Sequence, residues 1–525
     1  MALARARFPL LVIGSLLLPP PAGAQRQSPD RIREIIVRRE AVFDSVEARF
    51  WPYRVANTLH VETRPWVVRR ELLFAVGDQY DPALAAESER NLRALGIFRD
   101  VFLEVAPTDS GIVVIVHTAD AWTTTMGVGV AASGSQSVVD LSLQEGNLLG
   151  TRTVAVLGYR NDPDRSAITM AFDTPRAIAD RLGVGVSVVD RSDGRAGTFS
   201  VRAPFLSLSA REGGSVSASY LEGRVLRFAA GSPLPVDSLW RESAILRADA
   251  AVALRASPRG YVRMGVAAQA RREDVVPLLQ RDAIPRTVFL AVGPTLTARA
   301  PRYRRVTNVA SMDRIEDVDL GPSLSLGVLV APSAWGYPRT GIGSSLGLGA
   351  GIDLPSGFAR AGVRAAALFT ADGTDSSSVE AAATVVLQPD PRHLLVAHAS
   401  GGILRNPAPG FEFDLGLGTG LRAFPAHAFT GDRQFVLNAE YRALLWPRLF
   451  GLVGVGAAAF AGSAGAWFHG SDVRSGTEFG VGLRLASIRE VGGIWRLDLS
   501  RRQATDRLPS AWLVSIGRGF VFGAL

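Results

Sequence analysis

Apolar residues alternate with small, polar or charged residues along much of the chain, which is the period of β-strands. Such segments recur through residues 122–525 with no clear helical stretch between them, and the better ones run to about 9 to 14 residues, the length of a tilted membrane strand. The pattern predicts an antiparallel transmembrane β-barrel with a wet lumen. Two segments show the pattern clearly. In the first, one face carries Ala244, Leu246, Ala248, Ala250, Val252 and Leu254, and the other face carries Ser243, Arg247, Asp249 and Arg255. In the second, one face carries Phe435, Leu437, Ala439, Tyr441, Ala443 and Leu445, and the other face carries Asn438, Glu440 and Arg442.

Strand number follows from the spacing of these segments. At about 25 residues per strand with its connection, residues 122–525 predict about 16 strands, and an even number in any case. Short turns such as Trp446–Arg448 and Val491–Gly493 would permit about 20 strands. Four polar, charged or Pro-containing gaps are interpreted as longer extracellular loops: Gly231–Ser238, Glu273–Arg286, Ala300–Asp317 and Arg502–Ser510.

Residues 25–121 combine helical and strand patterns. A short β-rich stretch, Thr58–Val61, precedes a helical pattern in Trp66–Leu73, and Asp81 followed by Pro82 begins a second helix that ends at Gly96. Two strands follow, the first with Val101, Leu103 and Val105 on one face and the second over Ile112–Val116. The order β-α-α-β-β predicts a small α+β domain. Arg31–Arg38 and Glu40–Phe50 could add a strand and a helix.

Residues 1–24 have the pattern of a secretory signal peptide. Arg5 and Arg7 precede the apolar run Phe8–Leu18, and Ala22-Gly23-Ala24 forms a small-residue cleavage site. A membrane anchor is the alternative, but the apolar run is shorter than the roughly 20 residues that span a bilayer. We expect cleavage after Ala24 and export of the mature chain.

Composition excludes several classes of protein. With 47% hydrophobic and 20% charged residues, 54 glycines and a mean hydropathy of +0.17, the 525-residue chain is too apolar for disorder and too rich in glycine for a helical bundle. It has no cysteine, which excludes a disulfide scaffold, a thiolate metal site and a cysteine nucleophile. The net charge of +8 comes from scattered arginines without the basic stripe that nucleic-acid binding needs.

No motif indicates catalysis. Gly343–Gly347 matches G-x-S-x-G, but it lies in a Gly-rich strand pattern and lacks the strand-turn-helix context of a nucleophile elbow. The six histidines are scattered without ligand spacing. We expect no enzyme activity, no catalytic or metal-binding residue and no cofactor.

Several stretches carry a resemblance to a known family. Thr63–Phe74, Gly77–Asp81 and Glu89–Phe98 are similar to the outer-membrane protein assembly factors, the BamA/TamA and bacterial surface antigen superfamily, and Gln144–Gly150 resembles the E-x-N-L-L-G stretch early in their barrels. The resemblance implies a POTRA-like periplasmic domain over residues 25–121, followed by an outer-membrane barrel over residues 122–525.

The residues Leu421, Arg422, Ala423 and Phe424 resemble the V-R-G-F/Y motif of that family. In the family the motif lies on an extracellular loop that folds back into the barrel, where its Arg pairs with carboxylates of the lumen wall. The resemblance implies this role for Arg422, with Glu440 as a possible partner; an ordinary solvated loop arginine is the alternative. Two features depart from the family: Ala423 replaces Gly, and Phe460–Gly465 lacks the Asp of an F-x-D-x-G strand.

The resemblance implies a function in assembly or translocation at the bacterial cell outer membrane, with the N-terminal domain in the periplasm. That domain would bind clients by β-augmentation at the edge strand that carries Val101, Leu103 and Val105. The partners would be unfolded outer-membrane or secreted polypeptides, the lipid bilayer and periplasmic chaperones. The alternative is a passive channel or structural barrel without insertase activity, which Ala423 and the missing Asp favour. The identity of the client is left open.

Overall fold

A computed structural model describes residues 31–525 apart from 45, 134–135, 229–234, 278–286, 409, 418, 491–492 and 521–525. The predicted signal peptide, residues 1–24, lies outside the described residues. None of the helices among the described residues is long and apolar enough to cross a membrane.

The described elements follow one another from an N-terminal mixed region into a long series of strands. They are β1 (Ile32–Glu40), η1 (Glu47–Arg49), α1 (Trp51–Leu59), α2 (Pro65–Arg69), α3 (Pro82–Ala94), β2 (Phe98–Thr108), β3 (Gly111–Asp120), β4 (Thr124–Ser133), β5 (Gln136–Leu148), β6 (Thr153–Asn161), β7 (Ser166–Ile178), β8 (Leu182–Arg191), β9 (Gly194–Ala203), β10 (Glu212–Phe228), β11 (Pro235–Ser257), β12 (Gly260–Pro277), β13 (Thr287–Arg299), β14 (Tyr303–Thr307), β15 (Ile315–Asp319), β16 (Ser323–Ala331), η2 (Ser333–Trp335), β17 (Gly341–Leu354), β18 (Gly357–Thr370), β19 (Gly373–Asp390), β20 (His393–Arg405), β21 (Phe413–Leu417), β22 (Gly420–Leu421), β23 (Phe429–Gly431), β24 (Arg433–Leu449), β25 (Val453–Trp467), β26 (Ser475–Ser487), β27 (Trp495–Arg502) and β28 (Ala511–Arg518).

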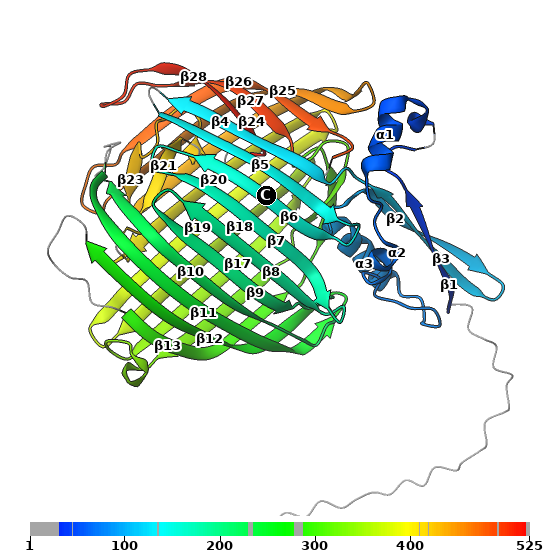
Figure 1. The fold of residues 1–525 in the computed structure, drawn as a ribbon, viewed down its shortest axis with the longest axis horizontal. Coiled ribbons are helices and arrows are strands. Elements are labelled where there is room, and N and C mark those ends of the chain that lie inside the picture. The colour runs from blue at the N-terminus through cyan, green and yellow to red at the C-terminus, as the bar shows by residue number, and fades with distance from the viewer. Residues whose placement is uncertain are drawn as a thin grey trace, which may run out of the picture.

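Twenty of these strands form one closed antiparallel barrel, in the order β4 to β13, β16 to β20 and β24 to β28, with β28 next to β4 (Figure 1). The predicted number of about 16 strands is therefore wrong, although the even number and the antiparallel barrel are correct. The reason is the length of the connections. Pairs of long strands such as β8 and β9, or β18 and β19, are joined by only two residues, so each strand uses fewer residues than the prediction assumed.

The two faces of the barrel wall differ as the period-two pattern requires. On β24 the side chains of Leu437 and Tyr441 are 49% and 44% exposed on the outside, while Asn438 and Glu440 between them are 5% and 1% exposed on the inside. Large apolar side chains are exposed in the same way on most strands. A continuous apolar exterior around a polar interior is the arrangement of a barrel that lies in lipid.

The predicted loop at Ala300–Asp317 lies at the end of the barrel that carries the N-terminal region, and Arg502–Ser510 lies at the opposite end, so the predicted loops are not all on one side as expected. This segment joins β13 to β16 and contains the hairpin of β14 and β15, and it contacts the N-terminal region. The prediction was wrong because a polar gap shows that two strands are joined but not at which end. Of the other predicted loops, much of Gly231–Ser238 and Glu273–Arg286 lies outside the described residues.

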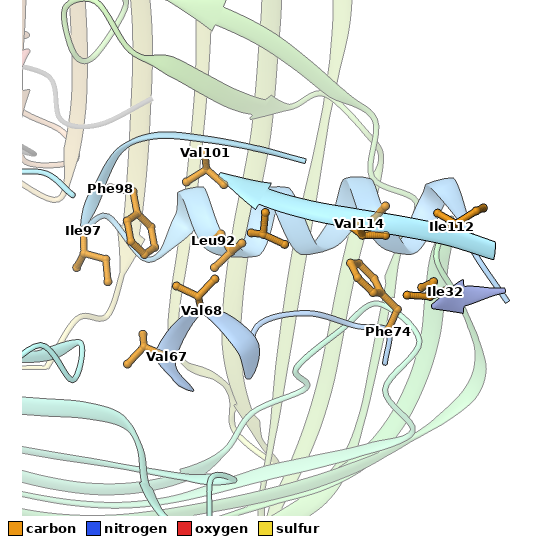
Figure 2. Packing of buried hydrophobic residues seen from close by; sticks show 12 residues of the cluster. Ile32, Val67, Val68, Phe74, Leu92, Ile97, Phe98, Val101, Ile112 and Val114 are labelled. Carbon is orange, nitrogen blue, oxygen red and sulfur yellow. The ribbon is translucent and has the colours of Figure 1, made fainter. Parts of the chain in front are cut away.

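The N-terminal region packs at one end of the barrel (Figure 1). Its sheet has the order β1-β3-β2, with β1 parallel and β2 antiparallel to β3. One side of the sheet packs on α2 and α3 around a small apolar core, shown in Figure 2. This core contains Ile32, Val67, Val68, Phe74, Leu92, Ile97, Phe98, Val101, Ile112 and Val114.

The prediction of a POTRA-like domain is corrected by this arrangement. The predicted first strand at Thr58–Val61 is absent, because residues 51–59 form α1, and the strand lies instead at β1. The predicted helix over Trp66–Leu73 is only the five-residue α2. The second helix does begin as predicted, with the Asp81 side chain accepting a hydrogen bond from the Ala83 N–H. What results is a small three-stranded α+β unit with no clear POTRA domain.

Candidate functional site in the barrel lumen

The connection between β20 and β24 folds into the lumen and carries the motif predicted at residues 421–424. Within it, β21 pairs with β22 and β23 to form a small sheet separate from the barrel wall. Leu421, Ala423 and Phe424 are completely buried, and Arg422 is 4% exposed. We call residues 406–432 the lumen loop.

Arg422 is surrounded by three carboxylates of the barrel wall. Its Nη2 lies 2.9 Å from Glu440 Oε2 on β24, its Nε lies 2.9 Å from Asp498 Oδ2 on β27, and its Nη1 lies 3.4 Å from Glu478 Oε1 on β26. The guanidinium also stacks on the ring of Phe460, 3.7 Å from its centroid. Arg422 is therefore a buried, fully engaged side chain and not a solvated loop arginine.

The predicted partner, Glu440, is shared among several arginines. Besides Arg422, it accepts a hydrogen bond of 2.6 Å from Arg442 Nε and lies 2.9 Å from Arg484 Nη2. Asp498 in turn bonds to Arg484 Nη1 at 2.6 Å and to Arg496 Nη1 at 2.8 Å. Buried ions are tolerated when each has partners of opposite charge, so this network can hold the lumen loop firmly against β24, β26 and β27.

The backbone of the motif is held as well as its side chain. The N–H groups of Arg422 and Ala423 donate to the Glu478 carboxylate, at 2.8 and 2.7 Å. Ala423 does not adopt a positive φ, so its backbone does not require the glycine of the family motif. The replacement of that glycine by alanine is therefore compatible with an inserted loop.

An apolar cluster lies next to the ionic network. The ring of Phe424 covers Gly476 on β26, where a Cβ would overlap the ring. Its neighbours in the cluster are Leu415, Leu421, Ala428, Phe429, Val436, Ala464 and Ala466. The motif thus anchors the loop through burial of Leu421 and Phe424 in addition to the charge of Arg422.

Two of the three carboxylates around Arg422, Glu478 and Asp498, were not predicted as its partners. The segment Phe460–Gly465, where an aspartate was sought, supplies the ring of Phe460 and no acid, while Glu478 and Asp498 come from the next two strands. A signal for both existed, because each is an acidic residue on the inward set of an alternating strand. The prediction did not connect them to Arg422, because their pairing depends on the packing of strands 56 and 76 residues away along the chain.

The barrel closes at a weak seam beside this loop. Strands β28 and β4 share only two residue pairs, Ser515 with Ala131 and Ile516 with Val130, whereas β27 and β28 share eight and β4 and β5 share ten. The lumen loop contacts the far side of the seam, where the Ala426 N–H donates to Gln136 Oε1 at 2.9 Å. One loop therefore binds wall residues on both sides of the seam.

His427 pairs with Asp414 within the loop and links the loop to Asp164 in the β6–β7 turn and to Phe228 at the end of β10. Its ring nitrogens lie 2.6 Å from Asp414 and 3.0 Å from Asp164, and the ring stacks on Phe228. Burial lowers the pKa of His427, but the hydrogen bonds to Asp164 and Asp414 outweigh it and raise the pKa to about 9. The imidazole is therefore cationic near neutral pH.

The residues predicted to bind clients lie on β2, an edge of the N-terminal sheet. Val101 is buried in the core, Leu103 packs against it, and Val105 is 37% exposed. Two groups of this edge already have partners in α3: Arg93 Nη1 donates to Val101 O at 3.4 Å, and the Leu103 N–H donates to Glu89 Oε2 at 3.4 Å. A peptide that added here would have to displace both contacts.

No group of three or more histidine, aspartate or glutamate side chains suited to a metal ion occurs in the part of the chain that the structure describes. The lumen cluster pairs its carboxylates with arginines. Its chemistry is that of a structural anchor.

The similarity to known proteins lies in the family that the motifs indicated. No family model matches the chain. Outer membrane protein assembly factor BamA of Neorickettsia risticii (strain Illinois) is 26% identical over 242 residues, which are 42% of this chain and 32% of that protein. The resemblance predicted from the motifs is thus confirmed: the chain is a homologue of BamA and an outer-membrane barrel, and it matches about a third of the length of that relative.

Solved structures of low sequence identity were also found. The crystal structure of BamA from Haemophilus ducreyi lacking POTRA domains 1–3 covers 93% of this chain and 85% of its own, at 12% identity and a TM-score of 0.38. CdiB from Escherichia coli covers 96% of this chain and 93% of its own, at 12% identity and a TM-score of 0.45. CdiB from Acinetobacter baumannii covers 93% and 74%, at 10% identity and a TM-score of 0.42.

Proposed function

We propose that this protein assembles or exports other polypeptides at the bacterial outer membrane, by opening the barrel at the seam between β28 and β4. The observation that carries the proposal is the two-pair ladder of that seam, which is bridged from inside by the lumen loop. A barrel that only had to be stable would gain from pairing these strands along their length, because unpaired strand edges are costly in lipid.

The clients would be unfolded outer-membrane or secreted polypeptides in extended conformation. An unpaired strand edge binds such a chain through its backbone N–H and C=O groups, without regard to most side chains. Opening the seam would expose the unpaired parts of β4 and β28 to a client strand inside the membrane. The N-terminal region would lie in the periplasm, and periplasmic chaperones are candidate partners that would deliver clients there.

The alternative function is a passive channel or structural barrel. The inserted lumen loop supports assembly over a channel, because a simple pore does not require a connection that is anchored inside its lumen through Leu421, Arg422 and Phe424. The two functions differ in whether the seam must open. A channel conducts with its wall closed, whereas the assembly function requires the seam to open.

Cells depleted of the protein test the proposal. Quantitative proteomics of the outer membrane would record which barrels or secreted proteins fall, and the wild-type chain, Arg422→Ala and Arg259→Ala would be supplied for rescue. Arg259 lies exposed in the turn between β11 and β12 and serves as the matched control. We expect a defined client set to fall and to be restored by the wild-type chain and Arg259→Ala, but not by Arg422→Ala. An unchanged proteome would refute the assembly function and leave the passive barrel.

The seam itself can be locked because the chain has no native cysteine. Ala131 and Ser515 are direct cross-strand partners, at a separation that suits a disulfide in antiparallel sheets. The oxidised Ala131→Cys/Ser515→Cys protein should fail to restore the clients, whereas the reduced form and either single variant should restore them. Full rescue by the oxidised form would show that clients do not use this seam.

A further inference from the structure

The segment between β13 and β16 lies inside the barrel at the end nearest the N-terminal region. Residues 300–322 form the β14–β15 hairpin and the turn that joins its strands, residues 308–314. Three apolar side chains of this segment, Val309, Met312 and Leu320, are 0%, 5% and 1% exposed. We call residues 300–322 the mouth segment.

The inner wall of the barrel is apolar where the mouth segment covers it. Val309 and Leu320 pack with Phe358 of β18, Val386 of β19 and, on β20, Leu394 and Val396. Leu394 and Val396 are 3% and 0% exposed, while Leu395 between them faces outward and is 40% exposed. Inward positions of a water-filled barrel are normally polar, so an apolar inner patch indicates a wall that is built to be covered.

Two glycines of the wall leave room for the segment. A Cβ built at Gly454 on β25 would lie 2.6 Å from Met312 Sδ, and one at Gly351 on β17 would lie 2.8 Å from Leu320 Cδ2. The Gly351 N–H also donates to Leu320 O at 2.9 Å. The wall therefore receives the mouth segment closely at two points on opposite sides of β18, β19, β20 and β24.

The other side of the segment is bound to the N-terminal region by ionic contacts. Arg93 of α3 forms a two-point ion pair with Asp317, at 2.6 and 3.0 Å, and Glu89 of α3 lies 2.7 Å from Arg305. Arg314 donates to Phe98 O at 3.0 Å. Charged contacts at the N-terminal region and apolar contacts at the wall give the segment two faces of different chemistry.

The mouth segment is also joined to the lumen cluster. Arg442 Nη1 donates to Val309 O at 3.0 Å, and Arg442 Nε donates to Glu440 Oε1, whose second oxygen binds Arg422. Two inserted segments from opposite ends of the barrel are thus linked through Arg442 and Glu440 of β24.

We propose that the mouth segment is a gate at the N-terminal end of the lumen, which the Asp317 and Glu89 ion pairs hold closed for as long as α3 stays docked. Opening requires that these ion pairs break and that Met312 and Leu320 leave their places at Gly454 and Gly351. Movement of the N-terminal region would then control access to the lumen. The inference does not depend on the nature of any client.

An engineered disulfide can hold the gate closed. A Cβ at Gly454 lies 3.2 Å from Met312 Cβ, and a disulfide with its usual Cβ separation of about 3.5 to 4.5 Å needs only a small shift. The full-length Met312→Cys/Gly454→Cys protein would be purified and its conductance measured in planar lipid bilayers, oxidised and reduced. Asp317→Asn would be introduced in the wild-type and double-cysteine backgrounds, with Asp506→Asn, an exposed residue between β27 and β28, as the matched control.

We expect Asp317→Asn to raise the frequency of conducting events several-fold over the wild type and Asp506→Asn, and the oxidised disulfide to abolish that rise until it is reduced. Labelling of a single Met312→Cys protein with a maleimide gives an independent readout, which Asp317→Asn should accelerate several-fold. Conductance that rises equally with the disulfide intact would overturn the gate. The gate would also be overturned if Asp317→Asn changed neither the labelling rate nor the conductance. Faster labelling without any change in conductance would overturn it as well.

Discussion

Arg502 Nη1 on β27 donates a hydrogen bond of 3.0 Å to Ser133 Oγ on β4, and so reaches across β28 to the far side of the seam. The same nitrogen lies 3.1 Å from Ala423 O of the lumen loop. This contact on the inner face adds to a ladder of only two residue pairs between β28 and β4.

Arg502→Ala should weaken the seam. It removes charged hydrogen bonds of the kind that contribute about 1.5 to 3 kcal/mol each. We expect the temperature at which the barrel loses its folded migration in an SDS gel to fall by several degrees, while Arg259→Ala leaves it unchanged. If Arg502→Ala and the wild type lost their folded migration at the same temperature, the backbone ladder between β28 and β4 alone would hold the seam.

Arg422→Lys should destabilise the lumen loop although it preserves the charge. A lysine cannot reach Glu440, Glu478 and Asp498 together, because it lacks the planar fork of the guanidinium. Arg422→Ala leaves three carboxylates without that partner, and loss of one member of a buried ion pair costs about 3 to 5 kcal/mol.

Limited proteolysis of the lumen loop in detergent would measure this effect. We expect the wild type to be cleaved most slowly, Arg422→Lys faster and Arg422→Ala fastest. Arg259→Ala is again the control. If Arg422→Lys resisted the protease as well as the wild type, a positive charge alone would be enough to hold the lumen loop, without the geometry of the guanidinium.

Ala423→Gly restores the residue of the family motif and should bring no gain. Ala423 has no positive φ that would require glycine, and glycine increases the conformational entropy of the unfolded chain at a cost of about 0.4 to 1 kcal/mol. We expect a slightly lower midpoint of urea unfolding and unchanged rescue of client levels. A clear gain in rescue would instead mean that alanine limits the movement of the loop.

The features of the fold that depend on neighbouring residues could be predicted from the sequence. The alternation of apolar and polar residues along β24 or β26 reflects the two faces of one strand, and it indicated a membrane barrel. Strand number and loop side depend on connections, which the pattern does not mark sharply. That is why about 16 strands were predicted for 20, and why residues 300–317 were assigned to the same side as Arg502–Ser510.

The site was predictable only in part, for a related reason. Arg422 and Glu440 were named from motifs, but Glu478 and Asp498 reach Arg422 through the curvature and register of neighbouring strands. The predicted POTRA-like order failed at its first strand, because β1 gains its stability from parallel pairing with β3, some 80 residues later, and not from a strong local pattern.

The attachment of the lumen loop through His427 should depend on pH. Its pKa is raised from the ordinary value of 6.5 to about 9, so the folded state favours the protonated ring. That contribution is fully present below about pH 6.5 and is lost as the pH rises through about 9. Cleavage of the loop by a protease active over this range should therefore accelerate between pH 7 and 10, after correction with an unstructured substrate.

His427→Gln provides the control, because a glutamine cannot carry the charge that Asp164 and Asp414 bind. The variant should be cleaved faster than the wild type at pH 6.5 and should show little further change up to pH 10. Asp414→Asn, which keeps the ring but removes one carboxylate, should move the transition of the loop to lower pH. If the wild type and His427→Gln accelerated in parallel, the pH dependence would come from another group, and His427 would be held by its stacking on Phe228.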